Sequence, residues 1–243
     1  MSGAGRECIR LISFDVGGTL IHPDPPVGAV YAEVLTRRGL PCREAEVERA
    51  FEESWEAASG GVAEAEERYS RAPHGERGYW RDLLSDTVRR LGGSLVPPGA
   101  ADELFERFAH AECWKVYPEV FDTLAALKRR GLEMAVVSNW DSRLPALLRE
   151  LGLRRHFGPL IVSAIEGAEK PDARLFRLAA DRAGVRPAEV LHVGDRLRED
   201  VQGAFGAGFA GLAIDRSAAG GEALDKVLDW LDAPFPAIRE VPP

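Results

Sequence analysis

Leu11-Ile12-Ser13-Phe14-Asp15-Val16-Gly17-Gly18-Thr19-Leu20 is an apolar run that ends in a carboxylate, two glycines and a threonine. The run predicts a buried strand, and the glycines permit a tight turn directly after it. Asp15 is therefore expected at the carboxyl end of its strand, where open α/β sheets bind their ligands. A carboxylate in that place either acts as a nucleophile or caps the following turn, and the rest of the chain must decide between these interpretations.

The composition is that of a globular protein, with 45% hydrophobic residues among 243 and a net charge of −8. The apolar runs are far shorter than the roughly 18 residues of a membrane span, so no membrane partner is expected. The start lacks a secretory profile, and Cys8, Cys42 and Cys113 form no CxxC pair, which favours a reducing cytoplasm. The dispersed negative charge argues against a nucleic-acid partner but is compatible with a small anionic substrate.

Residues 21–117 show helical periodicity with no convincing strand, beginning with a Pro-rich turn. Four amphipathic segments separated by Gly and Pro breaks predict a small helical bundle whose apolar faces cover one another. Their apolar stripes are Val30, Val34 and Leu35; Val47, Phe51 and Trp55; Leu83, Leu84, Val88 and Leu91; and Leu104, Phe105 and Phe108. We expect Trp55, Trp80 and Trp114 in the core rather than at a ligand site.

From Pro118 onward, strands and helices alternate, which predicts a parallel sheet covered by helices. The predicted strands are 134–138, 160–162, 190–193 and 212–214, and the predicted helices are 119–130, 144–151, 173–183, about 200–205 and about 222–231. The strand near Leu11 has natural partners only in this half of the chain. We therefore predict an α/β domain formed by residues 1–20 and 118–243, interrupted by the helical module of residues 21–117.

Three further polar clusters follow predicted strands. Ser138 and Asn139 offer a hydroxyl and an amide, suited either to hydrogen bonds with phosphate oxygens or to capping a helix. Lys170 precedes a proline, which suits the start of a helix. Taken alone, Lys170 is interpreted as a charged residue on the protein surface. Asp195 and Asp200 add two carboxylates, and hard oxygen ligands of this kind favour Mg²⁺.

Mg²⁺ in proteins is usually held by one or two carboxylates, several waters and substrate phosphate oxygens. We therefore expect Asp15 and Asp195 as direct ligands, with Asp200 orienting a water or capping its helix. His192 lies among apolar residues of a predicted strand and is expected to be a buried structural residue. The role of His22 stays open.

In this order, the four clusters resemble the motifs of the haloacid-dehalogenase-like (HAD) hydrolase superfamily along essentially the whole chain. The resemblance implies a Rossmann-like parallel sheet with the inserted helices as a cap. It further implies that Asp15 is the nucleophile, that Ser138 and Lys170 are its catalytic partners, and that Asp195 and Asp200 form the acidic fourth motif. Asp15 would attack a phosphorus, and the aspartyl-phosphate would then be hydrolysed.

The resemblance also assigns ligand contacts. The substrate, a small phosphorylated or otherwise anionic molecule, is expected to meet Gly18, Thr19, Ser138, Asn139 and Lys170. Mg²⁺ is expected to meet Asp15, the carbonyl of Gly17, Asp195 and Asp200. The identity of the substrate and the oligomeric state do not follow from the sequence.

Gly17 departs from the family pattern, because phosphatases of this family usually carry a second aspartate there as general acid and base. General acid–base catalysis contributes about 10²–10⁴-fold, so easy leaving groups should suffer least from its loss. Asp24 and His22 of the Pro-rich turn, and a metal-bound water, are alternative proton donors. The sequence also resembles a branch of HAD-like proteins without firm substrates, in which this aspartate is likewise replaced.

Three functions follow in order of preference. The first is a Mg²⁺-dependent phosphatase, and the second is a catalytically weak protein that binds metal and phosphate. The third is a 2-haloacid dehalogenase, whose family pattern also lacks the second aspartate. Dehalogenases of that type need no Mg²⁺ and usually lack the paired acids, so Asp195 and Asp200 favour phosphate chemistry.

Overall fold

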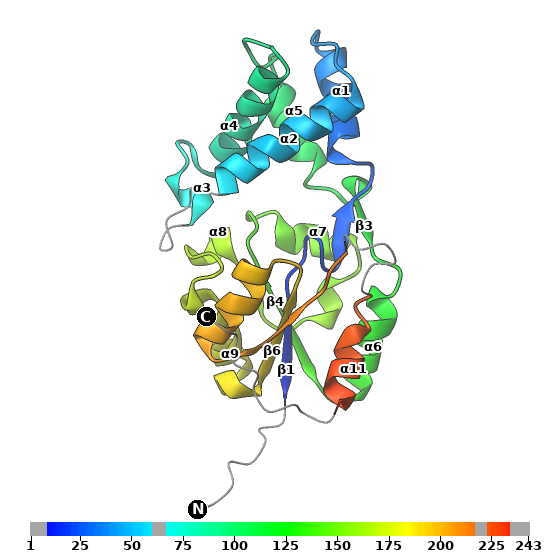
Figure 1. Ribbon diagram of the computed structural model, residues 1–243, viewed down its shortest axis with the longest axis vertical. Helices are drawn as coiled ribbons and strands as arrows, with labels where there is room; N and C mark the ends of the chain where they lie inside the picture. The colour runs from blue at the N-terminus through cyan, green and yellow to red at the C-terminus, as the bar shows by residue number, and fades with distance from the viewer. Residues whose placement is uncertain (1–8, 60–66, 217–222, 234–243) are drawn as a thin grey trace, which may run out of the picture.

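The computed structural model describes residues 9–59, 67–216 and 223–233. Figure 1 shows a lower unit built on a sheet and an upper unit built from helices. Within the described residues, no helix is long and apolar enough to cross a membrane. Cys8 and residue 222 of the last predicted helix lie outside the described ranges, whereas Cys42 and Cys113 are both free thiols.

A five-stranded parallel sheet lies at the centre of the lower unit, with the order β5-β4-β1-β6-β7. The strand β1 has a neighbour on each side, and Phe14 pairs in register with Val136 on one side and Val193 on the other. The partners of β1 thus come from the second half of the chain, as the sequence predicts. The strands are β1 (Leu11–Phe14), β4 (Glu133–Ser138), β5 (Leu160–Val162), β6 (Val190–Gly194) and β7 (Ala210–Ala213).

Helices cover both faces of this sheet. Successive side chains of β1 point to opposite faces, and all four are apolar or buried, so each face needs a covering layer. Ile12 and Phe14 belong to an apolar cluster with one set of helices, and Leu11 belongs to a second cluster with the other set. The first set is α6 (Val120–Arg129), α7 (Leu144–Glu150) and α11 (Lys226–Asp232); the second is α9 (Ala173–Ala183) and α10 (Gly203–Ala207). In Figure 1, α6 and α11 lie on one side of the sheet and α9 on the other. This three-layer α/β/α arrangement confirms the predicted fold class.

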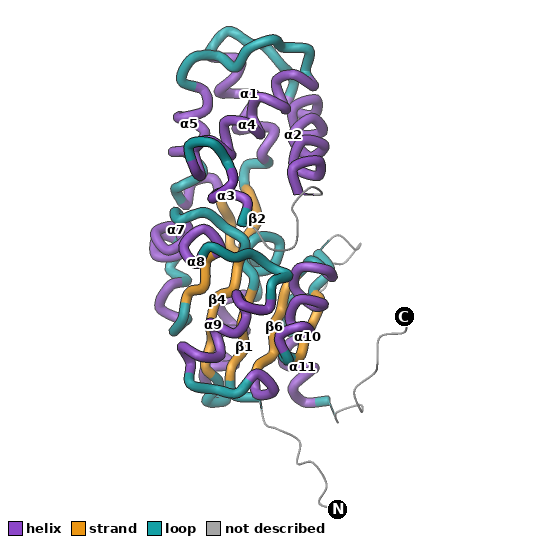
Figure 2. Tube along the Cα trace, turned by 90° about the vertical axis from the view of Figure 1, so that its left-hand side faces the viewer, coloured by secondary structure: helices purple, strands orange, loops and turns teal. Residues whose placement is uncertain are grey.

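The described residues of the upper unit form the α-helices α1 (Val27–Arg37), α2 (Glu44–Ser59), α3 (Arg68–Arg71), α4 (Gly75–Arg90) and α5 (Ala100–Arg107). Four of them, α1, α2, α4 and α5, carry the four apolar stripes predicted from the sequence. Their buried side chains form one cluster that includes Val34, Val47 and Leu84. Figure 2 shows this bundle stacked above the upper end of the sheet.

The two connections between the units pair with each other. Strand β2 (Ile21–Pro23) runs antiparallel to β3 (Trp114–Val116), with Ile21 opposite Val116. The expectation of no strand within residues 21–117 is therefore wrong, since strands of three residues are too short to show alternation. The two segments that connect the helical unit to the sheet unit therefore lie side by side as one β-ribbon. A movement of one unit relative to the other would have to bend both strands of this ribbon.

The remaining elements are short. They are the α-helix α8 (Ser163–Glu166), the 3₁₀-helices η1 (Ala111–Cys113), η2 (Arg154–His156) and η3 (Pro187–Glu189), and the π-helix η4 (Leu197–Gln202). The sequence predicts one helix over about 200–205, but the chain instead forms η4 followed by α10. Runs of π-helix are rare and occur frequently at functional sites. The other shifted elements are β7, which begins two residues before its predicted start, and α11, which begins at Lys226.

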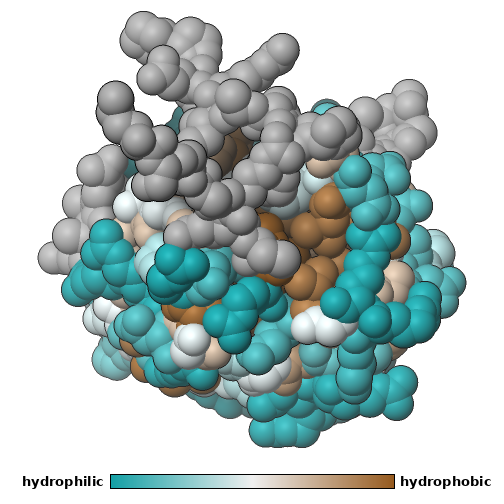
Figure 3. All heavy atoms as spheres, turned by 90° about the horizontal axis from the view of Figure 1, so that it is seen from below, coloured by the Kyte–Doolittle hydropathy of each residue, from teal (hydrophilic) through white to brown (hydrophobic). Residues whose placement is uncertain are grey.

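The end of the lower unit that lies away from the helices is seen in Figure 3. The visible atoms there are mainly hydrophilic, with one apolar patch beside the segments drawn in grey. Asp15, Ser138 and Asp195 lie at the carboxyl ends of β1, β4 and β6, and Lys170, from the loop between α8 and α9, bonds Asp15 there. They therefore lie at the opposite end of the sheet, beneath the helical unit.

Truncation of a core leucine tests this packing. Leu124 is 0% exposed on α6, whereas Leu95 is 81% exposed in the helical unit. We expect Leu124→Ala to lower the free energy of unfolding by about 2–5 kcal/mol, since it leaves a cavity in a packed cluster. Leu95→Ala, the matched control, should change it by less than about 0.5 kcal/mol. Urea denaturation measures both, and equal effects of the two substitutions would contradict the assignment of the core.

Candidate active site

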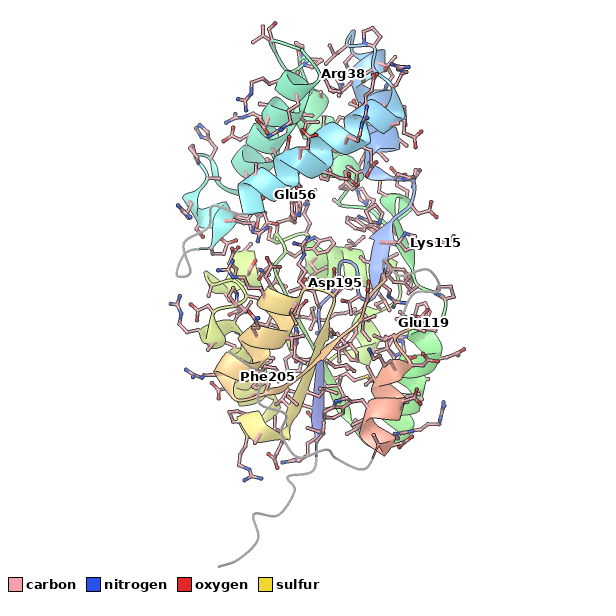
Figure 4. All side chains as sticks on the ribbon, in the orientation of Figure 1. Arg38, Glu56, Lys115, Glu119, Asp195 and Phe205 are labelled. Atoms are coloured by element: carbon pink, nitrogen blue, oxygen red, sulfur yellow. The ribbon has the colours of Figure 1, made fainter. Side chains whose placement is uncertain are left out.

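Four polar side chains meet where β1, β4 and β6 end. Asp15 follows β1, Ser138 is the last residue of β4, Asp195 follows β6, and Lys170 comes from the loop between α8 and α9. Figure 4 shows Asp195 at the upper end of the sheet, facing the helical unit. The structure thus brings together four residues that the sequence predicts as one site.

Asp15 is held through one of its two carboxylate oxygens. Ser138 Oγ donates a hydrogen bond to Asp15 Oδ1 at 2.7 Å, and Lys170 Nζ donates to the same oxygen at 2.7 Å. Oδ2 accepts no hydrogen bond from any residue in the described ranges. Asp15 itself is only 7% exposed and lines a cavity. The carboxylate is therefore fixed at Oδ1 and leaves Oδ2 available.

Lys170 lies between two carboxylates. Its Nζ donates both to Asp15 Oδ1 and to Asp200 Oδ1. Burial disfavours the ammonium, but the charges of Asp15 and Asp200 outweigh it and raise the pKa of Lys170. Burial likewise opposes ionisation of Asp200, yet the Lys170 charge and a hydrogen bond from His192 hold the pKa of Asp200 below its usual range. Both groups are charged at neutral pH.

Asp200 has both oxygens occupied by protein donors. Its Oδ1 meets Lys170 Nζ and also His192 Nε2 at 3.2 Å, and its Oδ2 accepts from the Arg196 N–H at 2.8 Å. These bonds occupy both oxygens of Asp200 with protein donors, so Asp200 is less available than Asp15 and Asp195 as a direct metal ligand. The expectations that it meets Mg²⁺ or orients a water stay predictions.

His192 is fully buried, which confirms the structural role expected of it. Its Nδ1 lies 2.9 Å from Ser13 Oγ, and burial lowers the pKa of His192. Since ionised Asp200 can only accept, Nε2 must carry the ring proton, and Nδ1 then accepts from the Ser13 hydroxyl. Ser13 was not singled out by sequence, because a serine in a buried strand carries no motif.

Asp195 is the carboxylate whose charge is least compensated. Burial, together with the negative charges of Asp15 and Asp200, raises the pKa of Asp195 to about 7. One oxygen from each of these three aspartates lies within 4.8 Å of the others. Asp15 and Asp195 thus offer carboxylate oxygens close together, and hard oxygen donors of this kind fit a divalent cation such as Mg²⁺.

Two predicted substrate contacts have other partners in the structure. Asn139 Nδ2 donates to the Lys170 carbonyl at 3.0 Å, and its Oδ1 accepts from the Lys170 N–H at 2.7 Å, so the amide holds the lysine backbone. Thr19 is fully buried and does not line the cavity; its hydroxyl points to Asp195 Oδ1 at 3.5 Å. Both side chains thus contact residues of the site, and their role as substrate contacts stays a prediction.

The two glycines after Asp15 have different constraints. Gly18 lines the cavity with a φ of 74°, and a Cβ there would lie 2.6 Å from Asp195 Oδ2. Gly17 has no positive φ, but a Cβ built on it would lie 3.0 Å from Trp140 Cζ3. The indole of Trp140 thus occupies the direction in which the aspartate expected at position 17 would project.

A cavity of about 320 Å³ lies between this cluster and the helical unit. Asp15, Ser138, Lys170 and Asp195 lie on its lower side. Its upper walls are largely aromatic and aliphatic: Val27, Tyr31, Phe51, Trp55, Tyr69, Trp80, Leu84, Leu104, Phe105, Phe108 and Trp114. Trp55, Trp80 and Trp114, expected in the core, are partly buried and line this cavity, although Trp114 also packs against the apolar clusters of both units.

Neither of the two side chains named as alternative proton donors lines the cavity. His22 packs against the ring of Tyr117 with centroids 4.7 Å apart, and its Nδ1 lies 3.0 Å from the Pro23 carbonyl. Asp24 forms an ion pair with Lys115 at 3.4 Å. The structure places both side chains on the ribbon side of the molecule, away from Asp15.

Polar contacts join the helical unit to the loops around the site. Arg68 Nε donates to Glu169 Oε2 at 2.8 Å, and both side chains are buried. Trp80 Nε1 donates to Asp141 Oδ2 at 2.9 Å, and Arg143 Nε donates to Asp141 Oδ1 at 2.8 Å. The Arg68–Glu169 and Trp80–Asp141 contacts link residues too far apart along the chain for sequence patterns to pair them.

The sheet order and helical layers place the chain among Rossmann-like α/β proteins. The family model described as haloacid dehalogenase-like hydrolase matches residues 9–208, and the chain belongs to this family of hydrolases. It is 37% identical over 228 residues to haloacid dehalogenase-like hydrolase domain-containing protein 3 of Mus musculus, covering 93% of this chain and 88% of that protein. It is 35% identical over 229 residues to the phosphoserine phosphatase of Thermus thermophilus, covering 86% and 89%.

Solved structures share the fold. The putative HAD-hydrolase YfnB from Bacillus subtilis, bound to magnesium, superposes with a TM-score of 0.74 at 18% identity, covering 93% of this chain and all (100%) of that chain. L-2-haloacid dehalogenase from Xanthobacter autotrophicus, with chloropropionic acid covalently bound, superposes with a TM-score of 0.62 at 26% identity, covering 93% and 85%.

The raised pKa of Asp195 predicts a pH dependence of stability. Its folded pKa lies above the ordinary 3.8, so this group stabilises the fold at low pH and loses that contribution as pH rises toward about 7. In metal-free protein, Asp195→Asn should therefore unfold at a higher temperature than wild type at about pH 8, with a smaller gap at about pH 5. Mg²⁺ should raise the melting temperature of wild type much more than that of the variant.

Calorimetry at the two pH values measures these differences. Asp229→Asn, at an exposed aspartate of α11, is the matched control and should follow wild type. A variant that parallels wild type at both pH values would show that repulsion among the three aspartates does not raise the pKa of Asp195.

Proposed function

We propose that this hydrolase is a Mg²⁺-dependent phosphatase that acts on small phosphomonoesters through Asp15. The observation that carries the proposal is the one-sided fixation of Asp15. Ser138 and Lys170 both bond Oδ1, so Oδ2 is left as an aligned nucleophile beside a buried ammonium. Asp195, whose pKa is raised by burial and by the charges of Asp15 and Asp200, lies beside Asp15 and suits a bound cation.

The reaction would proceed in two displacements at phosphorus. In the first, Asp15 Oδ2 forms a bond to phosphorus, and the ester P–O bond breaks with its electron pair on the leaving oxygen, which takes a proton from solvent. In the second, water attacks the phosphorus of the aspartyl-phosphate and the Oδ2–P bond breaks. Water's proton passes to solvent, inorganic phosphate leaves, and the carboxylate is restored.

Each polar neighbour would support this sequence. The Lys170 ammonium offsets negative charge on Asp15 and on the phosphoryl oxygens, and Asp200 and Asn139 hold that lysine in place. Asp15 and Asp195, with the Gly17 carbonyl, would hold Mg²⁺, which when bound neutralises phosphate charge. Asp200 would orient the lysine and the metal's surroundings from behind.

The phosphoserine phosphatase of Thermus thermophilus supports phosphate chemistry for this chain, since the two sequences align over most of both proteins. The Xanthobacter dehalogenase supports a second candidate, 2-haloacid dehalogenation by Asp15, for which Gly17 is no departure. A protein that binds metal and phosphate with little turnover is the third. The two carboxylates beside Asp15, Asp195 and Asp200, favour the phosphatase over the dehalogenase.

We also propose the division of labour within the chain. Residues 1–20 and 118–243 would form the catalytic core, and residues 21–117 would form the cap that selects the substrate. A cytoplasmic location, with no nucleic-acid or membrane partner, fits the composition.

The proposed nucleophile is tested by Asp15→Asn. This variant should lose phosphatase turnover by at least about 10³-fold, because a neutral amide cannot form the covalent intermediate. A panel of phosphate monoesters and 2-chloropropionate, each assayed with Mg²⁺ and with EDTA, separates the three functions. Circular dichroism and thermal melting of the variant establish that it is folded.

Each result on the panel has one meaning. Mg²⁺-dependent phosphate release, lost in Asp15→Asn, supports the phosphatase. Chloride release from 2-chloropropionate in EDTA identifies a dehalogenase. Metal-dependent phosphate binding without turnover identifies the binding protein, and undiminished phosphate release by Asp15→Asn would overturn the nucleophile.

Gly17 is tested with its neighbour Trp140. A Gly17→Asp side chain alone meets the indole, so the double variant Gly17→Asp/Trp140→Leu gives the new carboxylate space. Compared with Trp140→Leu alone, the double variant should raise turnover of alkyl phosphates by up to about 10²-fold, because it can protonate a poor leaving group. Aryl phosphates should gain less. An unchanged alkyl-to-aryl ratio of kcat/KM in a folded, Mg²⁺-binding double variant would mean that another group already supplies the proton.

A further inference from the structure

The cavity above Asp15 has an unusual concentration of tryptophan. The chain contains five tryptophans, and Trp55, Trp80, Trp114 and Trp140 all line this one cavity. Each of the four is only partly buried, so each keeps surface that the surrounding protein does not cover. The fifth, Trp230, lies on α11, away from the cavity.

The rings of this wall support one another. Trp55 of α2 stacks between Phe51 and Trp80, with centroids 6.3 Å and 5.8 Å away and interplanar angles of 19° and 17°. Trp114 and Trp140 contact each other at 5.0 Å on the side nearest Gly17. These mutual contacts restrict the side chains, so the wall is a preformed apolar surface that needs little reordering to receive a ligand.

The cationic side chains between this wall and the aspartates are already compensated. Arg68 is paired with Glu169, and Arg143 with Asp141. Arg196 lies 3.6 Å from Glu199, which also lines the cavity. Each of these three arginines already has a carboxylate partner within the protein. None of the three is therefore free to bind a carboxylate on the organic part of a substrate. A polar or zwitterionic organic group would therefore lose its hydration without gaining an equivalent partner.

We infer that the site selects phosphomonoesters whose organic part carries a flat aromatic ring. The inference rests on the proposed phosphatase function for the position of the phosphate at Asp15 and Lys170. The ring would then lie against Trp55 and its neighbours in the upper part of the cavity. A volume of about 320 Å³ is at the lower end for ligand pockets, which suits a one-ring or two-ring ester.

Four alkyl phosphates test this selectivity without varying the acidity of the leaving group greatly. They are 2-phenylethyl phosphate, 2-cyclohexylethyl phosphate, glycerol 3-phosphate and O-phosphoserine, each assayed with wild type and Mg²⁺. We expect kcat/KM for the phenylethyl ester to exceed those of the two polar esters by about 10–100-fold, the gain from burying one ring. It should exceed that of the cyclohexylethyl ester by about two- to tenfold, the gain from ring–ring contact.

The wall is tested by Trp55→Leu, with Trp230→Leu as the matched control. Trp55→Leu should lower the ratio of kcat/KM for the phenylethyl ester over glycerol 3-phosphate by about three- to tenfold. Trp230→Leu should leave that ratio unchanged. Phe51→Leu provides a second wall variant if Trp55→Leu does not fold, and the substrate series on wild type needs no variant at all.

A binding measurement separates this inference from the proposed function. Calorimetry with 2-phenylethylphosphonate, which cannot be hydrolysed, should show affinity that Trp55→Leu weakens and Trp230→Leu does not. If this phosphonate binds in that way while no ester is turned over, the ring selectivity stands and the phosphatase proposal fails. If esters are hydrolysed with equal kcat/KM for phenylethyl, cyclohexylethyl and polar groups, the phosphatase stands and the ring selectivity is overturned.

Discussion

The buried ammonium of Lys170 is the group on which the site's arrangement depends. It joins Asp15, at the end of β1, to Asp200, in the π-helix after β6, and the Asn139 amide after β4 holds its backbone. Without this charge, two buried carboxylates would face each other, and leaving a buried charge unpaired costs about 3–5 kcal/mol. The lysine therefore brings three segments of the sheet's carboxyl edge into one electrostatic unit.

The position of β1 makes that unit possible. Because β1 lies in the middle of the sheet, the ends of both neighbouring strands, β4 and β6, lie beside Asp15. The chain leaves the sheet immediately after this strand and returns about a hundred residues later through the paired ribbon β2–β3. The helical unit is thereby attached at the same edge as the carboxylates, and its inner surface becomes the wall of the cavity.

Trp140 connects the chemistry to this wall. The residue follows β4 beside Asn139, yet its ring packs over Gly17 and against Trp114 of the ribbon. A glycine at position 17 thus has a packing reason: the indole occupies the direction of a side chain. The same indole lines the cavity, so Trp140 lies both beside position 17 and in the apolar wall.

The sequence by itself determined the alternation of strands and helices after Pro118, the four amphipathic helices that precede it, and the strand ends at which Asp15, Ser138 and Asp195 emerge. These features follow from local periodicity and from the glycine, proline and polar residues that end each apolar run, and such signals act over a few residues.

Only the tertiary structure decided what each polar group bonds. Asn139 and Thr19 carry the donors expected at a phosphate site, but packing directs them to Lys170 and Asp195. The amino-acid sequence predicts that the aromatic stripes of the helices lie in the core. Helical periodicity indicates that one face of a helix is covered, but it does not indicate what covers that face. Whether Trp55 and Trp80 meet other helices or a cavity depends on how the helical unit docks on the sheet. That docking rests on contacts such as Arg68 with Glu169, about a hundred residues apart, which no local pattern encodes.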